Sequence, residues 1–252
     1  MSLDGKNALV TGGGRGIGEA IARKLASLGA SVVVCGRTEG PLQKIAEEIS
    51  GKAMVVDLGN REATDAFVHD LQDEWAIDIL VNNAGIAESA PLHKVDDAMW
   101  DRMMELNATA GFRLIRALVP GMIERGFGRV INLASNAGVS GYGYTAAYCA
   151  SKHAMVGYTR ALAIDLAKTQ VTINAVCPGW VDTDMVASAV TRIAGKTGRS
   201  DKEARGSLEK MTPQGRIIAP TEVAHLVASL CADEARGIHG QAIVIDGGQV
   251  LK

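Results

Sequence analysis

The chain has 252 residues, 29 of them glycine; 47% of its residues are hydrophobic, only 4% are aromatic, and its net charge is −2. A chain of this length buries enough surface to fold without disulfides or metals, and its hydrophobic content excludes a disordered protein. The near-neutral charge argues against binding of nucleic acid, and no apolar run reaches the roughly 18 residues of a membrane helix.

Cysteine and histidine positions argue against a metal-centred protein. The four cysteines, at 35, 149, 177 and 231, include no close pair, which fits neither a zinc site nor a disulfide framework. The five histidines are scattered, with no pair at metal-ligand spacing. We therefore expect no metal and four buried, reduced thiols. Since residues 1–6 also lack an apolar signal core, we expect a cytoplasmic protein.

Predicted strands and helices alternate along the chain. Apolar runs predict strands at 7–11, 32–34, 53–56, 77–81, 129–133, 171–176 and 241–245. Helical spacing predicts helices at 17–28, 42–49, 61–75, 148–168 and 221–230, and one long helix or two at 96–124. Because the strands are continuously apolar, this order predicts an α/β fold: a parallel seven-stranded sheet with helices on both faces, in a single domain spanning 1–252.

One stretch interrupts the alternation. Residues 179–216 are polar, carry small residues and a charge cluster, and hold no predicted strand. Long insertions of this kind in compact domains usually serve a function. We expect a substrate lid at about 183–215, the alternative being a plain surface loop.

A glycine-rich turn follows the first predicted strand. Residues 11–18 read Thr-Gly-Gly-Gly-Arg-Gly-Ile-Gly and lead directly into the first helix. Glycine permits positive φ and lets a phosphate approach the backbone, while the N–H groups of the helix N-terminus face a diphosphate. A turn at this place in a βα series is typical of dinucleotide binding.

The end of the second predicted strand indicates which dinucleotide binds. An acid there would bind the ribose 2′-hydroxyl of NAD. Here Gly36 is followed by Arg37, and the first acid, Glu39, comes later. Arg37 and Arg15 can bracket a 2′-phosphate through charge-assisted hydrogen bonds. We therefore predict NADP(H) as the cofactor.

At this point the whole chain resembles the short-chain dehydrogenase/reductase family. The shared motifs are Thr-Gly-x-x-x-Gly-x-Gly at 11–18, Asn82-Asn83-Ala84-Gly85, Asn107, Ser135, Tyr148-x-x-x-Lys152 and Pro178-Gly179. The chain resembles the single-domain bacterial 3-oxoacyl-thioester and polyketide ketoreductases, and hydroxyacyl and hydroxybutyrate dehydrogenases are also similar, notably at Pro178-Gly179-Trp180-Val181. This resemblance implies a Rossmann-type doubly wound sheet and an NADP-dependent oxidoreductase that interconverts a ketone and a secondary alcohol.

The resemblance assigns catalytic roles to Asn107, Ser135, Tyr148 and Lys152. It implies that Tyr148 protonates the ketone oxygen, that Ser135 orients it, and that Asn107 steadies a water in a proton relay through Lys152. Tyr148 and Lys152 are i and i+4 on one predicted helix, so they share a face. We expect the nearby ammonium to lower the pKa of the phenol from its ordinary value of about 10.

The resemblance also implies a set of cofactor contacts. They are Gly12, Gly14, Arg15, Gly16, Ile17, Gly18, Arg37, Asp57, Leu58, Asn83, Ala84, Gly85, Tyr148, Lys152, Pro178, Gly179, Val181 and Thr183. Asp57 would touch the adenine edge, with a helix cap as the alternative. Asn83 and Gly85 would line the adenosine ribose.

The composition of the lid also bears on the substrate. Residues 185–211 hold six basic and three acidic side chains, which suits an anionic or phosphopantetheine-bearing substrate, unless this is a solvated helix face. Acyl-carrier-protein reductases of the family tend to have an arginine just before the sixth strand. This chain has Thr169-Gln170 there, with Arg129 and Lys168 nearby. A carrier protein, a CoA ester and a free ketone therefore stay open.

Three functions remain. The first is an NADPH-dependent reductase of 3-oxoacyl thioesters, the second a carbonyl reductase or alcohol dehydrogenase of broader ketones, and the third a non-catalytic dinucleotide-binding protein. The four intact catalytic positions disfavour the third. The resemblance also implies a homotetramer, paired through the central helices and the last strand. Small residues on the Tyr148 helix would allow close packing: Ala147, Ala150, Ala154, Gly157 and Ala161.

Overall fold

The computed structural model describes residues 1–250; positions 251 and 252 of the predicted domain lie outside it. At its centre is a seven-stranded sheet in the order β3-β2-β1-β4-β5-β6-β7, with every neighbouring pair parallel. The strands are β1 (Asn7–Thr11), β2 (Ser31–Gly36), β3 (Lys52–Val55), β4 (Ile79–Asn82), β5 (Gly128–Leu133), β6 (Val171–Pro178) and β7 (Ala242–Ile245). The predicted parallel seven-stranded α/β fold is confirmed.

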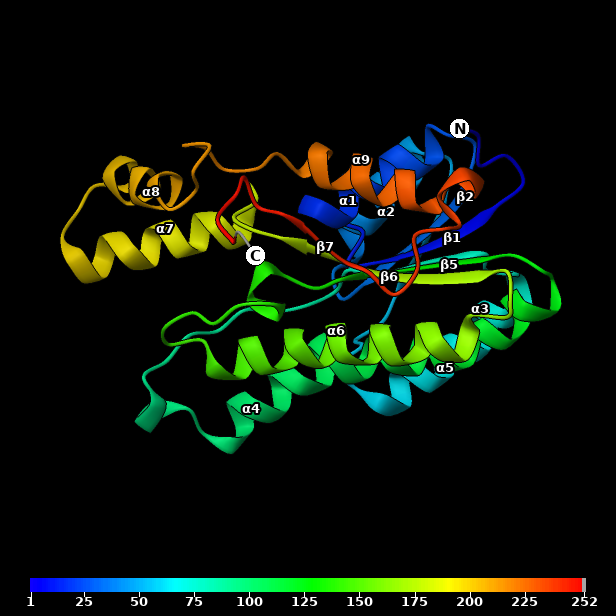
Figure 1. Cartoon of the computed structure of the whole chain (residues 1–252), viewed down its shortest axis with the longest axis horizontal. Coiled ribbons are helices and arrows are strands. Elements are labelled where there is room, and N and C mark those ends of the chain that lie inside the picture. The colour runs from blue at the N-terminus through cyan, green and yellow to red at the C-terminus, as the bar shows by residue number, and fades with distance from the viewer. Residues whose placement is uncertain (251–252) are drawn as a thin grey trace.

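Helices cover both faces of the sheet (Figure 1). One face carries α1 (Gly16–Ala26), α2 (Glu39–Glu48) and α9 (Pro220–Cys231). The other carries α3 (Arg61–Glu74), α4 (Asp97–Met104), α5 (Ala110–Glu124) and α6 (Ala146–Leu166). Along β1, Ala8 and Val10 pack with the first group and Leu9 with the second. A strand covered on both faces needs apolar residues at every position, which explains the continuous apolar runs.

The predicted helix at 96–124 is divided in two. A π-helical turn at Glu105–Thr109 separates α4 from α5, and it carries the fully buried Asn107. Single π-turns inside helices often occur at functional sites. The turn therefore marks Asn107 as a residue held in place by local backbone geometry.

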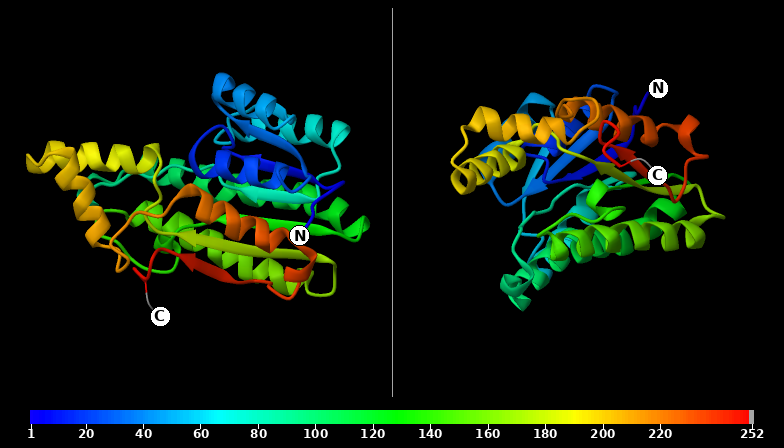
Figure 2. Two further views of the ribbon diagram at one scale, coloured as in Figure 1. Left: turned by 90° about the horizontal axis from the view of Figure 1, so that it is seen from above. Right: turned by 60° about the vertical axis from the view of Figure 1, so that its left-hand side comes forward.

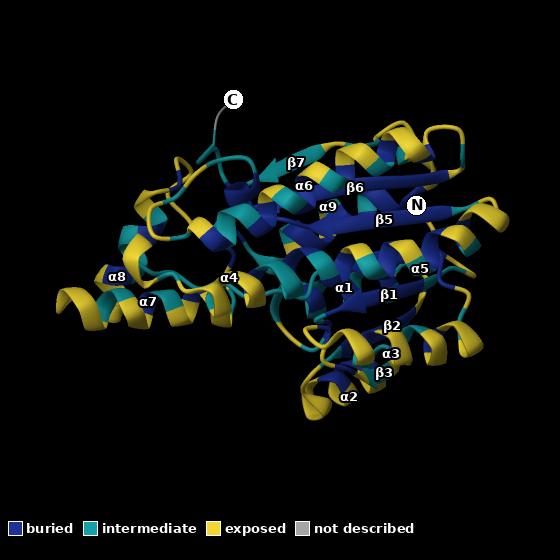
Figure 3. Ribbon diagram, turned by 90° about the horizontal axis from the view of Figure 1, so that it is seen from below, coloured by how far each residue is buried: buried dark blue, intermediate teal, exposed yellow. Residues whose placement is uncertain are grey.

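The segment predicted as a lid contains two helices, α7 (Asp184–Thr197) and α8 (Asp201–Lys210). They project past the carboxyl ends of the strands, and their outer faces are exposed (Figures 2 and 3). A small apolar cluster holds the pair together: Val186, Val190, Ala204, Leu208 and Ile217. The segment therefore has a core of its own, apart from the cores on the sheet.

The thiols differ from the prediction at one position. All four cysteines are free, and Cys35, Cys177 and Cys231 are buried. Cys149 is only half-buried, because it lies near the start of α6 rather than in the sheet or under it. Among residues 1–250 we find no helix with the length and apolar character needed to cross a membrane.

Candidate active site

The carboxyl ends of all seven strands lie at one edge of the sheet. The strand order reverses between β1 and β4: β2 and β3 lie on one side of β1, and β4 to β7 lie on the other. Open α/β sheets bind ligands at this edge, next to such a reversal. Most of the predicted site residues are therefore gathered at this edge. The glycine turn follows β1, Ser135 follows β5 and the lid follows β6, and α6 begins here as well.

The glycine turn between β1 and α1 requires glycine at specific positions. Gly12 and Gly16 have φ of +64° and +58°, in the left-handed region that favours glycine. A Cβ on Gly18 would lie 2.2 Å from the carbonyl oxygen of Gly12. The turn can therefore fold back tightly on the first turn of α1, whose N–H groups have no acceptor within the helix and face the edge. This arrangement fits a diphosphate.

Asn83 and Thr11 hold the glycine turn against β4. The Asn83 amide donates to the carbonyl oxygens of Thr11 (2.8 Å) and Gly12 (3.3 Å). The buried Thr11 hydroxyl accepts from the backbone N–H groups of Asn83 and Ala84, both at 2.9 Å. The predicted residues Asn83 and Ala84 thus support the turn, and Gly85 follows them. Thr11 was not among the predicted site residues, although a threonine that ends an apolar strand is a signal for such a role.

Two exposed arginines lie where the 2′-phosphate of NADP(H) would bind. Arg37 directly follows β2 and has no ion-pair partner among the residues that the structure describes. Arg15 lies 3.7 Å from the carboxylate of Asp184. Glu39 opens α2 and accepts a hydrogen bond from Gln43 at 2.7 Å, so its carboxylate is engaged along its own helix. The end of β2 therefore presents the Arg37 guanidinium, with Arg15 in the glycine turn beside it.

The two predicted residues after β3 differ in exposure. Asp57 is exposed, and its carboxylate accepts from the backbone N–H of Gly59 at 3.0 Å. The residue that caps α3 is Asn60, which accepts from Ala63, so the helix-cap alternative for Asp57 is wrong. Leu58 is buried in the core under α3 and α5, which leaves its backbone to face the edge.

Ser135, Tyr148 and Lys152 lie together. Ser135 follows β5 and is 8% exposed, and its hydroxyl oxygen accepts from the backbone N–H of Ala137 at 3.1 Å. Its hydroxyl also faces the phenol of Tyr148, on the first turn of α6. The Lys152 ammonium lies 6.0 Å from the centre of the Tyr148 ring and donates to the carbonyl oxygen of Leu133 at 2.7 Å.

The pKa of Tyr148 departs from the prediction. Burial raises it above its ordinary value of 10.0, and the hydrogen bond with Ser135 only partly offsets the rise. Lys152 is not among the groups that shift it, and its ammonium is directed at the carbonyl oxygen of Leu133. Burial lowers the pKa of Lys152 to about 8. The expectation of a lowered phenol pKa is therefore wrong for the protein alone, and Tyr148 is a phenol at neutral pH.

Asn107 connects three parts of the site. Its carboxamide exchanges hydrogen bonds with the backbone N–H (2.8 Å) and C=O (2.9 Å) of Ile86. It also donates to the hydroxyl of Ser151 at 3.0 Å, and Ser151 in turn donates to the carbonyl oxygen of Tyr148 at 2.8 Å. The fully buried Ser151 was missed by the sequence analysis, since a serine inside an apolar helix has no distinct spacing signal.

The lid begins directly after β6. Pro178 ends the strand, Val181 pairs with Ile218 as an isolated parallel bridge, and the hydroxyl of Thr183 donates to the carbonyl oxygen of Val181 at 3.2 Å. Thr183 also lies over the glycine turn, where a Cβ on Gly16 would be 3.1 Å from its methyl group. The base of the lid is thus packed against the predicted cofactor turn.

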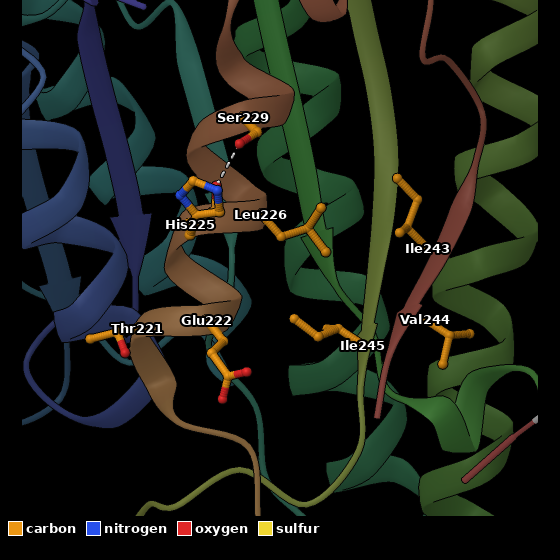
Figure 4. Close-up of a pocket in the computed structure, with 8 residues that line it drawn as sticks. All are labelled: Thr221, Glu222, His225, Leu226, Ser229, Ile243, Val244 and Ile245. Atoms are coloured by element: carbon orange, nitrogen blue, oxygen red, sulfur yellow. Dashed lines mark hydrogen bonds between the residues drawn. The ribbon is translucent and has the colours of Figure 1, made fainter. Parts of the chain in front are cut away.

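A hollow outside the candidate active site lies away from this edge. It is a groove of about 640 Å³ between α9 and β7 (Figure 4), with Leu226 from the helix and Ile243 and Ile245 from the strand facing it. Its remaining lining residues are Thr221, Glu222, His225, Ser229 and Val244. Within residues 1–250, no cluster of three or more His, Cys, Asp or Glu side chains is arranged to hold a metal.

The fold and these motifs define a short-chain dehydrogenase. The family described as short chain dehydrogenase matches residues 6–194, and the chain belongs to it. Among its relatives, the 3-oxoacyl-(acyl-carrier-protein) reductase FabG of Vibrio cholerae is 37% identical, with both chains fully covered. The D-beta-hydroxybutyrate dehydrogenase of Cupriavidus necator is also 37% identical, over 99% of this chain and all of its own. A crystal structure of actinorhodin polyketide ketoreductase with NADPH matches with a TM-score of 0.93 and 37% identity, over 99% of each chain.

Proposed function

We propose that the protein is an NADP(H)-dependent ketoreductase of 3-oxoacyl thioesters. The observation that carries the proposal is the cluster of the buried Ser135 and Lys152 with the half-buried Tyr148 at the carboxyl edge, its phenol protonated at neutral pH. A phenol and a serine hydroxyl side by side can donate to a single substrate oxygen. The relatives, a 3-oxoacyl reductase and a ketoreductase solved with NADPH, support the same reaction.

The catalytic residues divide the work around one oxygen atom. When bound, the cofactor supplies the hydride that reduces the ketone carbon. Tyr148 donates its proton to the developing alkoxide, and Ser135 donates a hydrogen bond to the same oxygen. Lys152, with a pKa of about 8, can pass a proton to Tyr148 near neutral pH. Asn107 holds the first turn of α6 in place through Ser151, and a water relay from Asn107 to Lys152 stays a prediction.

The residues at the edge fit NADP(H) better than NAD(H). The glycine turn offers backbone N–H groups to the diphosphate, and Arg15 and Arg37 offer two guanidinium groups to the 2′-phosphate. Glu39, the first acid after β2, accepts a hydrogen bond from Gln43. The cofactor contacts predicted for the remaining residues, such as Asp57 and Pro178, are part of the same proposal.

Unpaired cations on the lid support an anionic substrate. The lid acids Asp182 and Glu209 both bind Arg205, and Glu203 binds Ser200. Five lid cations form no ion pair within the described residues: Arg192, Lys196, Arg199, Lys202 and Lys210. Phosphates of CoA or of a carrier-borne phosphopantetheine carry the complementary charge. Carrier-protein docking through Arg129 has no support, because that side chain is 1% exposed.

A substrate panel tests this function. We expect NADPH oxidation with acetoacetyl-CoA, and a lower KM for it than for acetoacetyl-N-acetylcysteamine, which lacks the phosphates. Added salt should raise the first KM and leave the second unchanged. Faster turnover of simple aryl ketones would favour a broader carbonyl reductase. Tight NADPH binding without turnover of any ketone would contradict the proposal and favour a non-catalytic binding protein.

We further propose a cytoplasmic homotetramer, a single domain per chain with a lid at about 183–215. The apolar groove between α9 and β7 is one candidate contact face (Figure 4). The other is the outer face of α6, where Gly157 has open space above it and Ile164 is 78% exposed. Of the small α6 residues predicted to allow close packing, Ala147 is 3% exposed and so does not belong to this face. Sedimentation as a monomer at micromolar concentration would contradict the tetramer.

A further inference from the structure

The turn at residues 246–250, which we name the C-terminal turn, is built around a buried carboxylate. Asp246 follows β7 and is 4% exposed. Its Oδ1 accepts from the backbone N–H groups of Gly248 (3.0 Å) and Gln249 (3.1 Å), and its Oδ2 accepts from that of Val250 (2.9 Å). No cation pairs with it among the residues that the structure describes. A buried charge held by N–H groups alone fixes the turn in one conformation.

The same carboxylate reaches the residue next to Ser135. The Asn136 amide, on a side chain that is 5% exposed, donates to Asp246 Oδ2 at 3.3 Å and to the side-chain oxygen of Gln249 at 3.1 Å. Its own carbonyl oxygen lies 3.5 Å from the Ser135 hydroxyl. Asn136 opens the short 3-10 turn that sets the direction of the chain after Ser135. The carboxylate therefore holds the loop that carries the proposed catalytic serine.

Both ends of the lid segment pack on the C-terminal turn. A Cβ on Gly179 would lie 2.6 Å from the Cβ of Asp246, and the Gly179 N–H donates to the carbonyl oxygen of Ile245 at 3.0 Å. At the far end, a Cβ on Gly247 would lie 2.4 Å from the methyl group of Thr212. The N–H of Gln214 donates to the carbonyl oxygen of Gly247 at 3.2 Å. The C-terminal turn thus contacts the loop that carries Ser135 and both ends of the lid segment.

We propose that Asp246 is a positioning residue for the reaction: acting through Asn136, it fixes Ser135 relative to Tyr148 and sets the distance between Ser135 and the lid. The role rests on the proposed function, because it requires Ser135 to act on the substrate. It goes beyond that function in joining the lid and the serine loop through a single side chain. Asp246 touches neither substrate nor cofactor in this role.

Asp246→Asn and Asn136→Ala break the link from its two sides. In Asp246→Asn, an amide faces the Asn136 amide and one acceptor oxygen is lost; in Asn136→Ala the C-terminal turn keeps its own hydrogen bonds. We expect each to lower kcat about 10- to 100-fold, as sub-ångström misplacement of a reacting group does. In Asn136→Ala the KM for NADPH should stay within about twofold, because the glycine turn after β1, Arg37 after β2 and the packing of Gly179 on Asp246 are left unchanged.

Two readouts separate positioning from plain structural support. The exchanged pair Asn136→Asp with Asp246→Asn restores a donor facing a carboxylate, so it should recover at least half of the lost kcat on a logarithmic scale. In the alcohol-oxidation direction, the pH at which activity rises should move upward in Asn136→Ala, because Ser135 helps to lower the pKa of Tyr148. The control is Asp78→Asn, a buried carboxylate at the opposite edge of the sheet that accepts from Asn7 and Arg125. It should lose stability and keep kcat.

The outcomes decide between the two roles. A wild-type kcat and pH profile in folded Asn136→Ala would overturn the proposal, even if Asp246→Asn fails to fold. An exchanged pair no more active than Asp246→Asn would overturn it as well. The proposed function fails separately, by absence of ketone reduction in the wild-type protein.

Discussion

A buried cation lies near each end of β5, and the two cations differ in their partners. At the amino end, Arg129 is 1% exposed; it donates to the carbonyl oxygens of Gly128 and Gln170 and pairs with Asp233 at 3.1 Å. At the carboxyl end, Lys152 is 5% exposed and donates to the carbonyl oxygen of Leu133, and no carboxylate within residues 1–250 pairs with it. A buried cation without a counter-ion costs stability. Such a cost persists in proteins mainly where function requires it.

Neighbouring groups repeat the contrast. At the amino edge, the carboxylate of Asp78 accepts from Arg125 at 3.2 Å, so both charges there are paired. At the carboxyl edge, burial raises the pKa of Tyr148 and lowers that of Lys152 to about 8. Opposed shifts of this kind in adjacent groups are typical of acid–base sites. The amino edge therefore serves stability and the carboxyl edge serves chemistry.

The largest expected effect comes from removing the proton donor. Tyr148→Phe should lower kcat by about 10²- to 10⁴-fold, the range for losing a general acid, while the fold stays intact because the ring still packs. Steady-state kinetics and NADPH titration check this. Near-normal turnover with cofactor bound would contradict the role of Tyr148.

Replacing each buried cation with methionine tests directly whether the two cations have different roles. Arg129→Met leaves two carbonyl oxygens without donors and should cost about 2 kcal/mol of unfolding free energy, with kcat unchanged. Lys152→Met should lower kcat about 100-fold and raise stability at pH 7, because a protonated buried amine is removed. Urea denaturation and kinetics on both variants test the pair. A Lys152→Met protein as destabilised as Arg129→Met would show that both edges serve stability.

A smaller effect sharpens the cofactor side of the carboxyl edge. Arg37→Ala should weaken NADPH binding by about 10- to 100-fold, since a charge-assisted hydrogen bond contributes roughly 1.5–3 kcal/mol. Binding of NADH, which lacks the 2′-phosphate, should change less than about twofold. Arg23→Ala is the matched control: Arg23 is an arginine on the neighbouring α1, paired with Glu19 and Glu48. Equal losses for NADPH and NADH would contradict 2′-phosphate recognition.

The sequence predicted the sheet and the catalytic cluster because both depend on local signals. Apolar runs marked all seven strands, and i, i+4 spacing placed Tyr148 and Lys152 on one helix face. Three features could not be predicted. The π-turn at Asn107 depends on tertiary contacts with Ile86 and Ser151. The sign of the Tyr148 shift depends on burial by several elements, which spacing does not report.

The link from Asp246 to Asn136 was the third feature. It joins residues 110 positions apart in the chain, and neither belongs to a motif that local spacing could reveal. Strand alternation predicted that β5 and β7 share a sheet, yet gave no information about which side chains meet beyond their ends. Contacts between loops at a sheet edge are set by three-dimensional packing, so they escape one-dimensional patterns.

The smallest expected effect is a slope of stability against pH. The pKa of Lys152 is about 8 in the folded protein and has an ordinary value of 10.5 when unfolded. Below pH 8 both states are protonated and the fold bears the full cost of a buried ammonium. As pH rises from about 8 to 10.5, the folded state loses its proton first, so the cost is relieved and stability rises.

The measurement is the difference in unfolding free energy between wild type and Lys152→Met, without cofactor, from pH 7 to 10.5. Other lysines cancel in this difference, which should move in favour of wild type by no more than about 1.4 kcal/mol per pH unit. The same difference for Arg129→Met should stay flat, because an arginine keeps its charge over this range. A flat line for Lys152 would mean that its ammonium has a partner in solution, and the contrast between the two ends of β5 would then disappear.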